Sequence, residues 1–220
     1  MYKVIKRLID LTGSTILLIL LLPILLPICI ILKFTGEGYI FYLQRRIGYK
    51  NKYFDIFKFA TMLKNSPNIG TGTITTRNDP RVFPFGKWLR MTKINELPQI
   101  INVVKGDMSF VGPRPLVQKT FDFYPEDVKS RIYNSKPGIT GIGSIIFRDE
   151  EKLISEAKEP PFEFYGRVIA PYKGALEMWY QDHQSLKTDV LIVFLTVWAI
   201  IAPQSELVYK VFKDLPERRF

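Results

Sequence analysis

The sequence predicts a mixed α/β fold that is attached to a membrane from one side, that is, a monotopic membrane protein. Residues 16–32 form an apolar run, residues 39–42 and 53–59 have strand composition, and helical spacing returns at 94–104. The chain has 220 residues, of which 47% are hydrophobic and 24% charged, so it can form one folded domain beside a membrane segment. This composition excludes a disordered or low-complexity protein.

The first predicted element is a kinked membrane helix within residues 1–36. Its 17-residue apolar run would reach about 26 Å at ~1.5 Å per residue, which is marginal for a hydrocarbon core of ~30 Å. Pro23 and Pro27 each remove a backbone donor and predict a bend. Cations flank the run on both sides, whereas a spanning helix usually shows them on one side. We therefore predict a re-entrant helix that is retained in the mature protein, with a plain spanning helix as the alternative.

The second predicted domain, residues 37–220, begins with a small β unit. The aromatic runs at 39–42 and 53–59 are separated by a Gly-Tyr-Lys-Asn turn, which predicts two antiparallel strands. Residues 64–80 contain many turn formers without apolar periodicity, so we expect a long loop there.

Helices should make up most of the remainder. We expect one at 94–104, with Asn95 as its N-cap and Gly106 at its end. Further helices are expected at 149–158 and at 163–184, the latter kinked near a proline at position 171.

A second apolar run at 190–202 has 13 residues, which is too short to span a bilayer. It fits either a buried core helix or an amphipathic helix at an anionic membrane surface. Trp179, Tyr180 and Trp198 are the aromatic residues expected at that surface.

The charge and the rare residues restrict the chemistry. The net charge of +10 favours anionic partners, including anionic membrane lipids. The sequence carries no nucleic-acid-binding motif, so we expect no nucleic-acid partner. Cys29 and His183 are the only residues of their kinds, which argues against a disulfide, a zinc site or a Ser-His-Asp triad.

Ionic side chains gather around the start of the predicted 94–104 helix. Arg90 and Arg114 could clamp phosphate oxygens, and Glu96 beside a diphosphate would suit Mg²⁺. The alternative is that Glu96 only complements the helix dipole and that the cations only contact lipid.

Several motifs in a fixed order resemble the bacterial sugar transferases, also called monotopic phosphoglycosyl transferases. They are Gln44–Gly48, Tyr53–Met62, Asp79–Arg81, Glu96–Pro115 and Pro137–Gly141, and the likeness runs from Lys6-Arg7-x-x-Asp10 to about Ala202. The resemblance implies transfer of a sugar 1-phosphate from a nucleotide diphosphate sugar, usually a UDP-sugar, to undecaprenyl phosphate. UMP would be released at the cytoplasmic face of the bacterial inner membrane, in the first membrane step of capsule, exopolysaccharide, lipopolysaccharide or glycan assembly. A homo-oligomer is one possible assembly.

One position departs from the family pattern. In the family an aspartate before the glutamate attacks the β-phosphate and the glutamate holds Mg²⁺, whereas this chain has Asn95 before Glu96. An amide cannot replace a carboxylate nucleophile. Three explanations stay open: an inactivating substitution, an active branch that uses Glu96 or transfers directly to the acceptor, and a non-catalytic binding or scaffold protein. We favour the active branch, because most phosphate-binding cations are retained.

The resemblance also assigns further site residues. It implies phosphate or nucleotide contacts for Lys58, Arg90 and Arg114, and metal binding for Glu96. Arg46 matches a motif as well, but could instead cap the β turn or pair with Asp10. Sugar specificity is expected in the loop after residue 64 and in residues 142–151, where the chain departs from the family's tryptophan-containing pattern.

Overall fold

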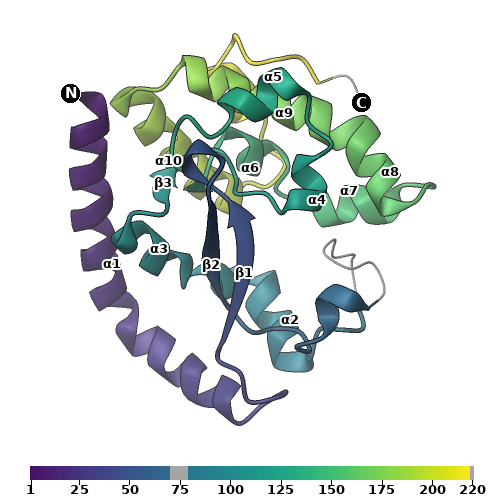
Figure 1. The fold of residues 1–220 in the computed structure, drawn as a ribbon. Coiled ribbons are helices and arrows are strands. Elements are labelled where there is room, and N and C mark those ends of the chain that lie inside the picture. The colour runs from purple at the N-terminus through teal and green to yellow at the C-terminus, as the bar shows by residue number, and fades with distance from the viewer. Residues whose placement is uncertain (70–78, 219–220) are drawn as a thin grey trace.

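The computed structural model describes residues 1–69 and 79–218, and it begins with one long helix, α1 (Tyr2–Lys33). Pro23 and Pro27 lie inside α1, and Figure 1 shows that the helix bends along its length without folding into a hairpin. Among the described residues, α1 is the one helix that is long and apolar enough to cross a membrane. Most of its apolar side chains are exposed, which indicates contact with a membrane. The re-entrant path through that membrane stays a prediction.

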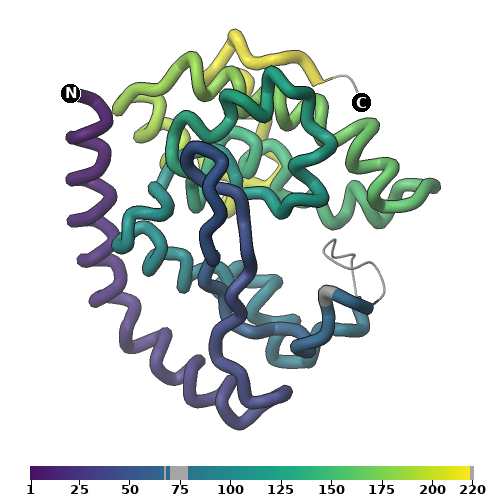
Figure 2. The backbone as a smooth tube through the Cα atoms, viewed as in Figure 1, coloured from purple at the N-terminus to yellow at the C-terminus, as the bar shows by residue number. Residues whose placement is uncertain are grey.

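The two aromatic runs form the predicted β hairpin. β1 (Phe41–Ile47) pairs antiparallel with β2 (Tyr53–Phe59). The turn η1 (Tyr49–Asn51) places Lys50 and Asn51 at φ 54° and 57°. Figures 1 and 2 show the hairpin running down the middle of the molecule, with α1 along one side. The first strand is longer than predicted, and it carries the Gln44–Gly48 motif into the centre of the fold.

The predicted helix at 94–104 is two separate elements. A short turn, η3 (Ile94–Glu96), precedes α3 (Gln99–Lys105). Pro98 occupies the N-cap position of α3, where its missing backbone N–H interrupts no hydrogen bond within the helix. Asn95 is therefore not the N-cap, and that prediction is wrong. Gly106, at φ 91°, ends α3 as predicted.

Polar residues near the start of α1 tie it to the rest of the protein. Arg7 donates to two carbonyl oxygens at the end of α3, at 2.6 and 2.9 Å. Asp10 accepts the backbone N–H of Phe110 at 3.0 Å, and Lys6 pairs with Asp189 at 2.6 Å. These contacts explain the Lys6-Arg7-x-x-Asp10 pattern, while the domain boundary at residue 36 stays a prediction.

The second half of α1 also packs against the protein. Three of its leucine and isoleucine side chains join a buried cluster with Phe59 of β2 and Leu89. The three are Leu25, Ile28 and Leu32. One stripe of the helix therefore faces protein, while the remaining surface faces outward.

A short parallel pair, β3 (Ser109–Val111) and β4 (Gly138–Thr140), holds two of the sequence motifs together. A Cβ atom on Gly112 would lie 2.3 Å from the carbonyl oxygen of Lys136. Only glycine permits this close approach of the two backbones.

The remaining elements are short helices and helical turns, together with the longer α9 and α10. Those other than α10 are η2 (Ser66–Asn68), α2 (Pro84–Met91), α4 (Gln118–Phe121), α5 (Glu126–Arg131), α6 (Ile142–Ile146), α7 (Glu150–Glu156), α8 (Pro161–Phe164), a π-helical turn (Tyr165–Ile169), α9 (Ala170–Asp182) and α11 (Leu207–Val211). α7 matches the helix expected at 149–158, and the π-helical turn lies just before the proline at position 171, where a kink was expected. Most of the loop expected at 64–80 lies outside the described residues.

The second apolar run lies in α10 (Leu186–Ile201), which has one buried and one exposed apolar side. Its position at a membrane surface stays a prediction. Ile192 and Leu195 are buried in the main core, whereas the opposite side exposes apolar side chains such as Phe194. Trp198 is partly exposed, as expected for a surface aromatic. Trp179 and Tyr180 are buried because they belong to α9, which packs into the core, so their predicted surface position is wrong.

Candidate active site

The β hairpin places two predicted cations on one face. Tyr42 lies opposite Lys58 and Arg46 lies opposite Phe54, so Arg46 and Lys58 share a face of the antiparallel pair. Arg46 donates from Nε to Gln44 Oε1 at 3.1 Å and from Nη1 to the carbonyl oxygen of Pro115 at 3.0 Å. These bonds fix the guanidinium within the site.

Neither structural role that was considered for Arg46 is found. The guanidinium does not cap the β turn, since it bonds to Gln44 and Pro115. It does not pair with Asp10 either, because that carboxylate accepts from Ser109 and from the backbone of Phe110. The two alternatives are therefore wrong, and Arg46 lines the same pocket as Lys58.

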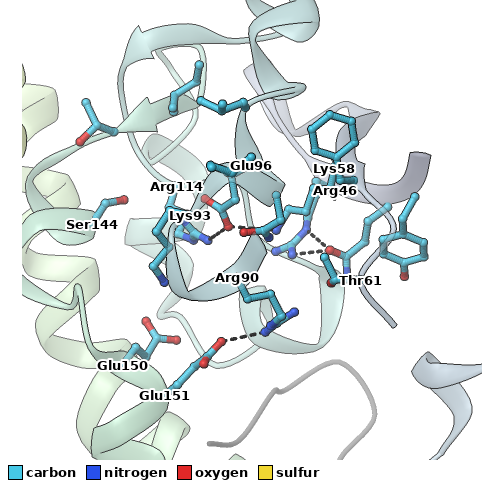
Figure 3. Close-up of a pocket in the computed structure, with 18 of the residues that line it drawn as sticks. Arg46, Lys58, Thr61, Arg90, Lys93, Glu96, Arg114, Ser144, Glu150 and Glu151 are labelled. Carbon is cyan, nitrogen blue, oxygen red and sulfur yellow. Dashed lines mark hydrogen bonds and ion pairs between the residues drawn. The ribbon is translucent and has the colours of Figure 1, made fainter. Parts of the chain in front are cut away.

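Glu96, at the end of η3, brings two predicted cations together. Its Oε1 atom accepts from Arg114 Nη2 at 3.0 Å and from Lys58 Nζ at 3.3 Å. Figure 3 shows this pair of contacts at the centre of the site. The Lys58 and Glu96 side chains are only 15% and 21% exposed, so water screens their interaction weakly.

Burial and charge shift the pKa values of this cluster. Burial raises the pKa of Glu96, but the charges of Arg114 and Lys58 outweigh burial and hold that pKa well below its usual value. Burial lowers the pKa of Lys58 to about 8, although Glu96 opposes the change. Burial and the charge of Arg114 lower the pKa of Arg46 to about 10. At neutral pH one carboxylate thus faces three cations, which favours an anionic ligand.

Arg90 lines the same pocket but belongs to a different ion pair. Its Nη2 atom contacts Glu151 Oε1 of α7 at 2.8 Å. Figure 3 shows this pair apart from the contacts around Glu96. Arg90 and Arg114 therefore do not form one clamp, and each would meet a different part of a ligand.

Asn95 is buried beside the ion cluster. It is 6% exposed, and within the described part of the chain its side-chain oxygen has no hydrogen-bond partner. Leaving such a group unpaired costs about 1–3 kcal/mol. Packing alone does not explain an amide at this position.

The site cations, Glu96 and Asn95 all border a single cavity of about 1050 Å³. Its polar wall includes Lys58, Glu96 and Arg114. Its apolar wall includes Leu17 of α1 and Ile200 of α10, both of which are exposed. The cavity therefore joins an ionic site to the two helices that present apolar surface, and it suits a ligand with a charged head and an apolar chain.

Four polar residues on the cavity wall across from Lys58 were not predicted as individual site residues. They are Ser144, Arg148, Glu150 and Lys173. The first three fall in the segment 142–151, whose departure from the family pattern was the available signal. Lys173 lies in the middle of α9 and gave no signal, because its pairing with Glu150 depends on tertiary packing.

A divalent metal next to Lys58 and Arg114 would have one protein carboxylate, that of Glu96. Among residues 1–69 and 79–218, no group of three or more His, Cys, Asp or Glu residues is placed to hold a metal. Mg²⁺ commonly binds one or two carboxylates together with substrate phosphate oxygens. The ionised carboxylate of Glu96, next to cations that suit phosphate, fits that pattern.

Comparison with known proteins identifies the family. Residues 1–203 match the family described as "Bacterial sugar transferase". The chain is 34% identical over 198 residues to "Undecaprenyl-phosphate glucose phosphotransferase" of Komagataeibacter xylinus, covering 87% of this chain and 35% of the relative. It is 31% identical over 210 residues to "Exopolysaccharide production protein ExoY" of Rhizobium meliloti (strain 1021), covering 89% and 84%.

A further relative is "UDP-glucose:undecaprenyl-phosphate glucose-1-phosphate transferase" of Escherichia coli (strain K12), with 34% identity over 198 residues. That match covers 89% of this chain and 40% of the relative. The chain thus spans well under half of two of these relatives and most of the third. Because the family match covers nearly the whole chain, the protein belongs to the bacterial sugar transferase family.

Proposed function

We propose that the protein transfers a sugar 1-phosphate from a nucleotide diphosphate sugar, in the first instance a UDP-sugar, to undecaprenyl phosphate. UMP would be the second product, and the reaction would begin a surface polysaccharide at the cytoplasmic face of the membrane. The observation that carries this proposal is the cluster of Glu96, Arg114 and Lys58 in a cavity that reaches α1 and α10. The names of the relatives, which act on undecaprenyl phosphate or in exopolysaccharide production, support it.

The cations of the cluster would bind the diphosphate. Arg114 and Arg46 present planar guanidinium groups that suit phosphate oxygens, and Lys58 adds a third positive charge. Glu96 would hold Mg²⁺ together with the diphosphate. When bound, Mg²⁺ would offset the negative charge that develops on the leaving phosphate.

Direct transfer to the lipid agrees best with the geometry of Glu96 and Asn95. Two cations share one oxygen of Glu96 and keep its pKa low, so this carboxylate is a weak nucleophile. The Asn95 amide is weaker still. We therefore propose that an oxygen of the lipid phosphate attacks the phosphorus next to the sugar. The bond to the bridging oxygen breaks, UMP leaves with that oxygen, and a lipid diphosphate sugar forms.

The test is UMP release by the purified protein in detergent or nanodiscs. A panel of UDP-sugars with undecaprenyl phosphate and Mg²⁺ should yield UMP only when donor and lipid are both present. Arg167, exposed and paired with Glu159 on the surface, provides the control variant Arg167→Gln, which should retain full activity. Absence of UMP from every donor would leave a binding or scaffold role for the same fold. A phosphosugar adduct on the wild-type protein would instead contradict direct transfer.

A further inference from the structure

Two polar atoms on the wall opposite Lys58 lack hydrogen-bond partners. The Oγ atom of Ser144 and the Nη1 atom of Arg148 are both shielded from solvent, and neither has a partner in the described part of the protein. Both residues line the cavity, Ser144 from α6 and Arg148 from the segment that follows it. Unpaired buried donors are costly, most of all on a charged group. This wall is therefore suited to a ligand that brings acceptor oxygens.

The charges around these two residues favour an anion. The two carboxylates that line this wall already have cationic partners, since Glu150 pairs with Lys173 and Glu151 pairs with Arg90. Among residues 1–69 and 79–218, Arg148 has no such carboxylate partner. A guanidinium group binds phosphate through fixed, directional N–H donors.

This wall lies apart from the Glu96 cluster. Figure 3 shows Ser144 pointing into the pocket from the side opposite Lys58 and Arg46, with Arg114 between them. The cavity of about 1050 Å³ is large for one small-molecule site. There is room for two phosphate-bearing substrates that meet near Arg114.

The same wall is continuous with α10. Thr140 of β4, close to the start of α6, shares a hydrogen bond with Thr196 of α10 at 2.7 Å. Ala199 and Ile200, one turn further along α10, line the cavity, and the outer side of that helix exposes apolar side chains. A lipid that approaches along α10 would therefore bring its head group to Ser144.

We propose that Ser144 and Arg148 form a second phosphate subsite, and that this subsite takes the phosphate monoester of the lipid acceptor rather than the diphosphate of the donor. The inference rests on the proposed function and adds the place where the acceptor binds. An acceptor phosphate held there would face the diphosphate at Arg114, with its apolar chain leaving along α10.

Direct binding measurements test this subsite. The probes are a short-chain prenyl monophosphate, the matching prenyl alcohol and UDP-glucose, titrated calorimetrically into the detergent-solubilised full chain. Arg148→Gln removes a charged hydrogen-bond donor and should lower the affinity for the monophosphate about 10- to 100-fold. Ser144→Ala should lower that affinity about threefold to tenfold. Neither variant should change the affinity for UDP-glucose or for the alcohol, and the surface control Arg167→Gln should change nothing.

Each other outcome overturns the inference in a recognisable way. Weaker binding of UDP-glucose, with the monophosphate unaffected, would assign the subsite to the donor. Equal affinities of wild type and both variants for both probes would show that the subsite does not exist. If the wild type bound neither the monophosphate nor any UDP-sugar of the activity panel, the proposed function would be refuted as well.

A second variant keeps the test valid if Arg148→Gln destabilises the protein. Should Arg148→Gln lower the Tm by several degrees, Arg148→Lys would be measured instead, because it retains the charge without the planar guanidinium group. It should lower only the affinity for the monophosphate, by a smaller factor than Arg148→Gln, and an unchanged affinity would overturn the inference.

Discussion

Replacing Glu177 with glutamine should change how the stability of the protein depends on pH. Glu177 lies in α9 and is 1% exposed. One of its carboxylate oxygens accepts the backbone N–H of Arg114 at 3.5 Å, and the other has no partner among the described residues. Burial raises the pKa of Glu177 to about 7, although the positive charges of Lys173 and Arg114 oppose this.

The sign and size of the effect follow from that pKa. A glutamate that titrates at 4.5 when unfolded and at about 7 when folded binds its proton more tightly in the folded state. The resulting stabilisation is complete below pH 4.5 and is lost as the pH rises through 7. At ~1.4 kcal/mol per pH unit, the loss amounts to about 3 kcal/mol. Glutamine has no proton to lose, so Glu177→Gln removes this part of the pH dependence.

The assay is thermal unfolding in detergent at pH 5 and at pH 8. About 2.5 kcal/mol of this loss falls between pH 5 and pH 8, because the unfolded glutamate is already mostly ionised at pH 5. For a chain of this size ~1 kcal/mol shifts the Tm by about 2–4 °C, so the Tm difference between the two pH values should shrink by about 5–10 °C in Glu177→Gln. Glu163, which is exposed on α8, provides the control Glu163→Gln, which should behave as wild type. An equal pH dependence in Glu177→Gln and wild type would refute the argument that burial raises the pKa of Glu177.

Three further predictions concern the ion cluster and its neighbour. Arg114→Gln removes one of the two ion pairs of Glu96 and leaves the pair with Lys58. It should lower the affinity for UDP-glucose about 10- to 100-fold in calorimetric titrations. An unchanged affinity would show that Arg114 does not contact the donor. Because the pKa of Lys58 is about 8, the affinity for UDP-glucose should fall between pH 7 and pH 9 as this cation is lost. Lys58→Arg should abolish that fall, and persistence of the fall would assign it to another group. Asn95→Asp should acquire a phosphosugar adduct by intact-protein mass spectrometry with UDP-sugars and Mg²⁺; failure to form one would mean that position 95 cannot host a nucleophile.

Elements with a local signal could be predicted from the sequence. The hairpin followed from aromatic and β-branched runs around a turn, and the end of α3 followed from Gly106, which adopts the left-handed conformation. The start of α3 was misplaced because Asn95 is a good N-cap by type, whereas Pro98 determines where the regular helix begins.

The site was predictable only in part, because its contacts join distant positions. Lys58 and Arg114 lie 38 and 18 residues from Glu96. The local charge pattern suggested that Arg114 belongs with Glu96, whereas only the family motifs brought in Lys58. Ser144 and Arg148 could not be found in this way. Their significance depends on which neighbouring carboxylates are already paired, and tertiary packing decides that.

The attachment of α1 has a practical consequence. Arg7 closes the end of α3, Asp10 holds the backbone at Phe110, and Leu32 fills a cluster against Leu89. A truncated chain that starts after the helix would expose Leu89 and its apolar neighbours to water. It would also leave the hydrogen-bonding groups that contact Arg7 and Asp10 without partners. A water-soluble version of this protein should therefore be sought by replacing the lipid-facing side chains of the helix with polar ones, while the helix itself is kept.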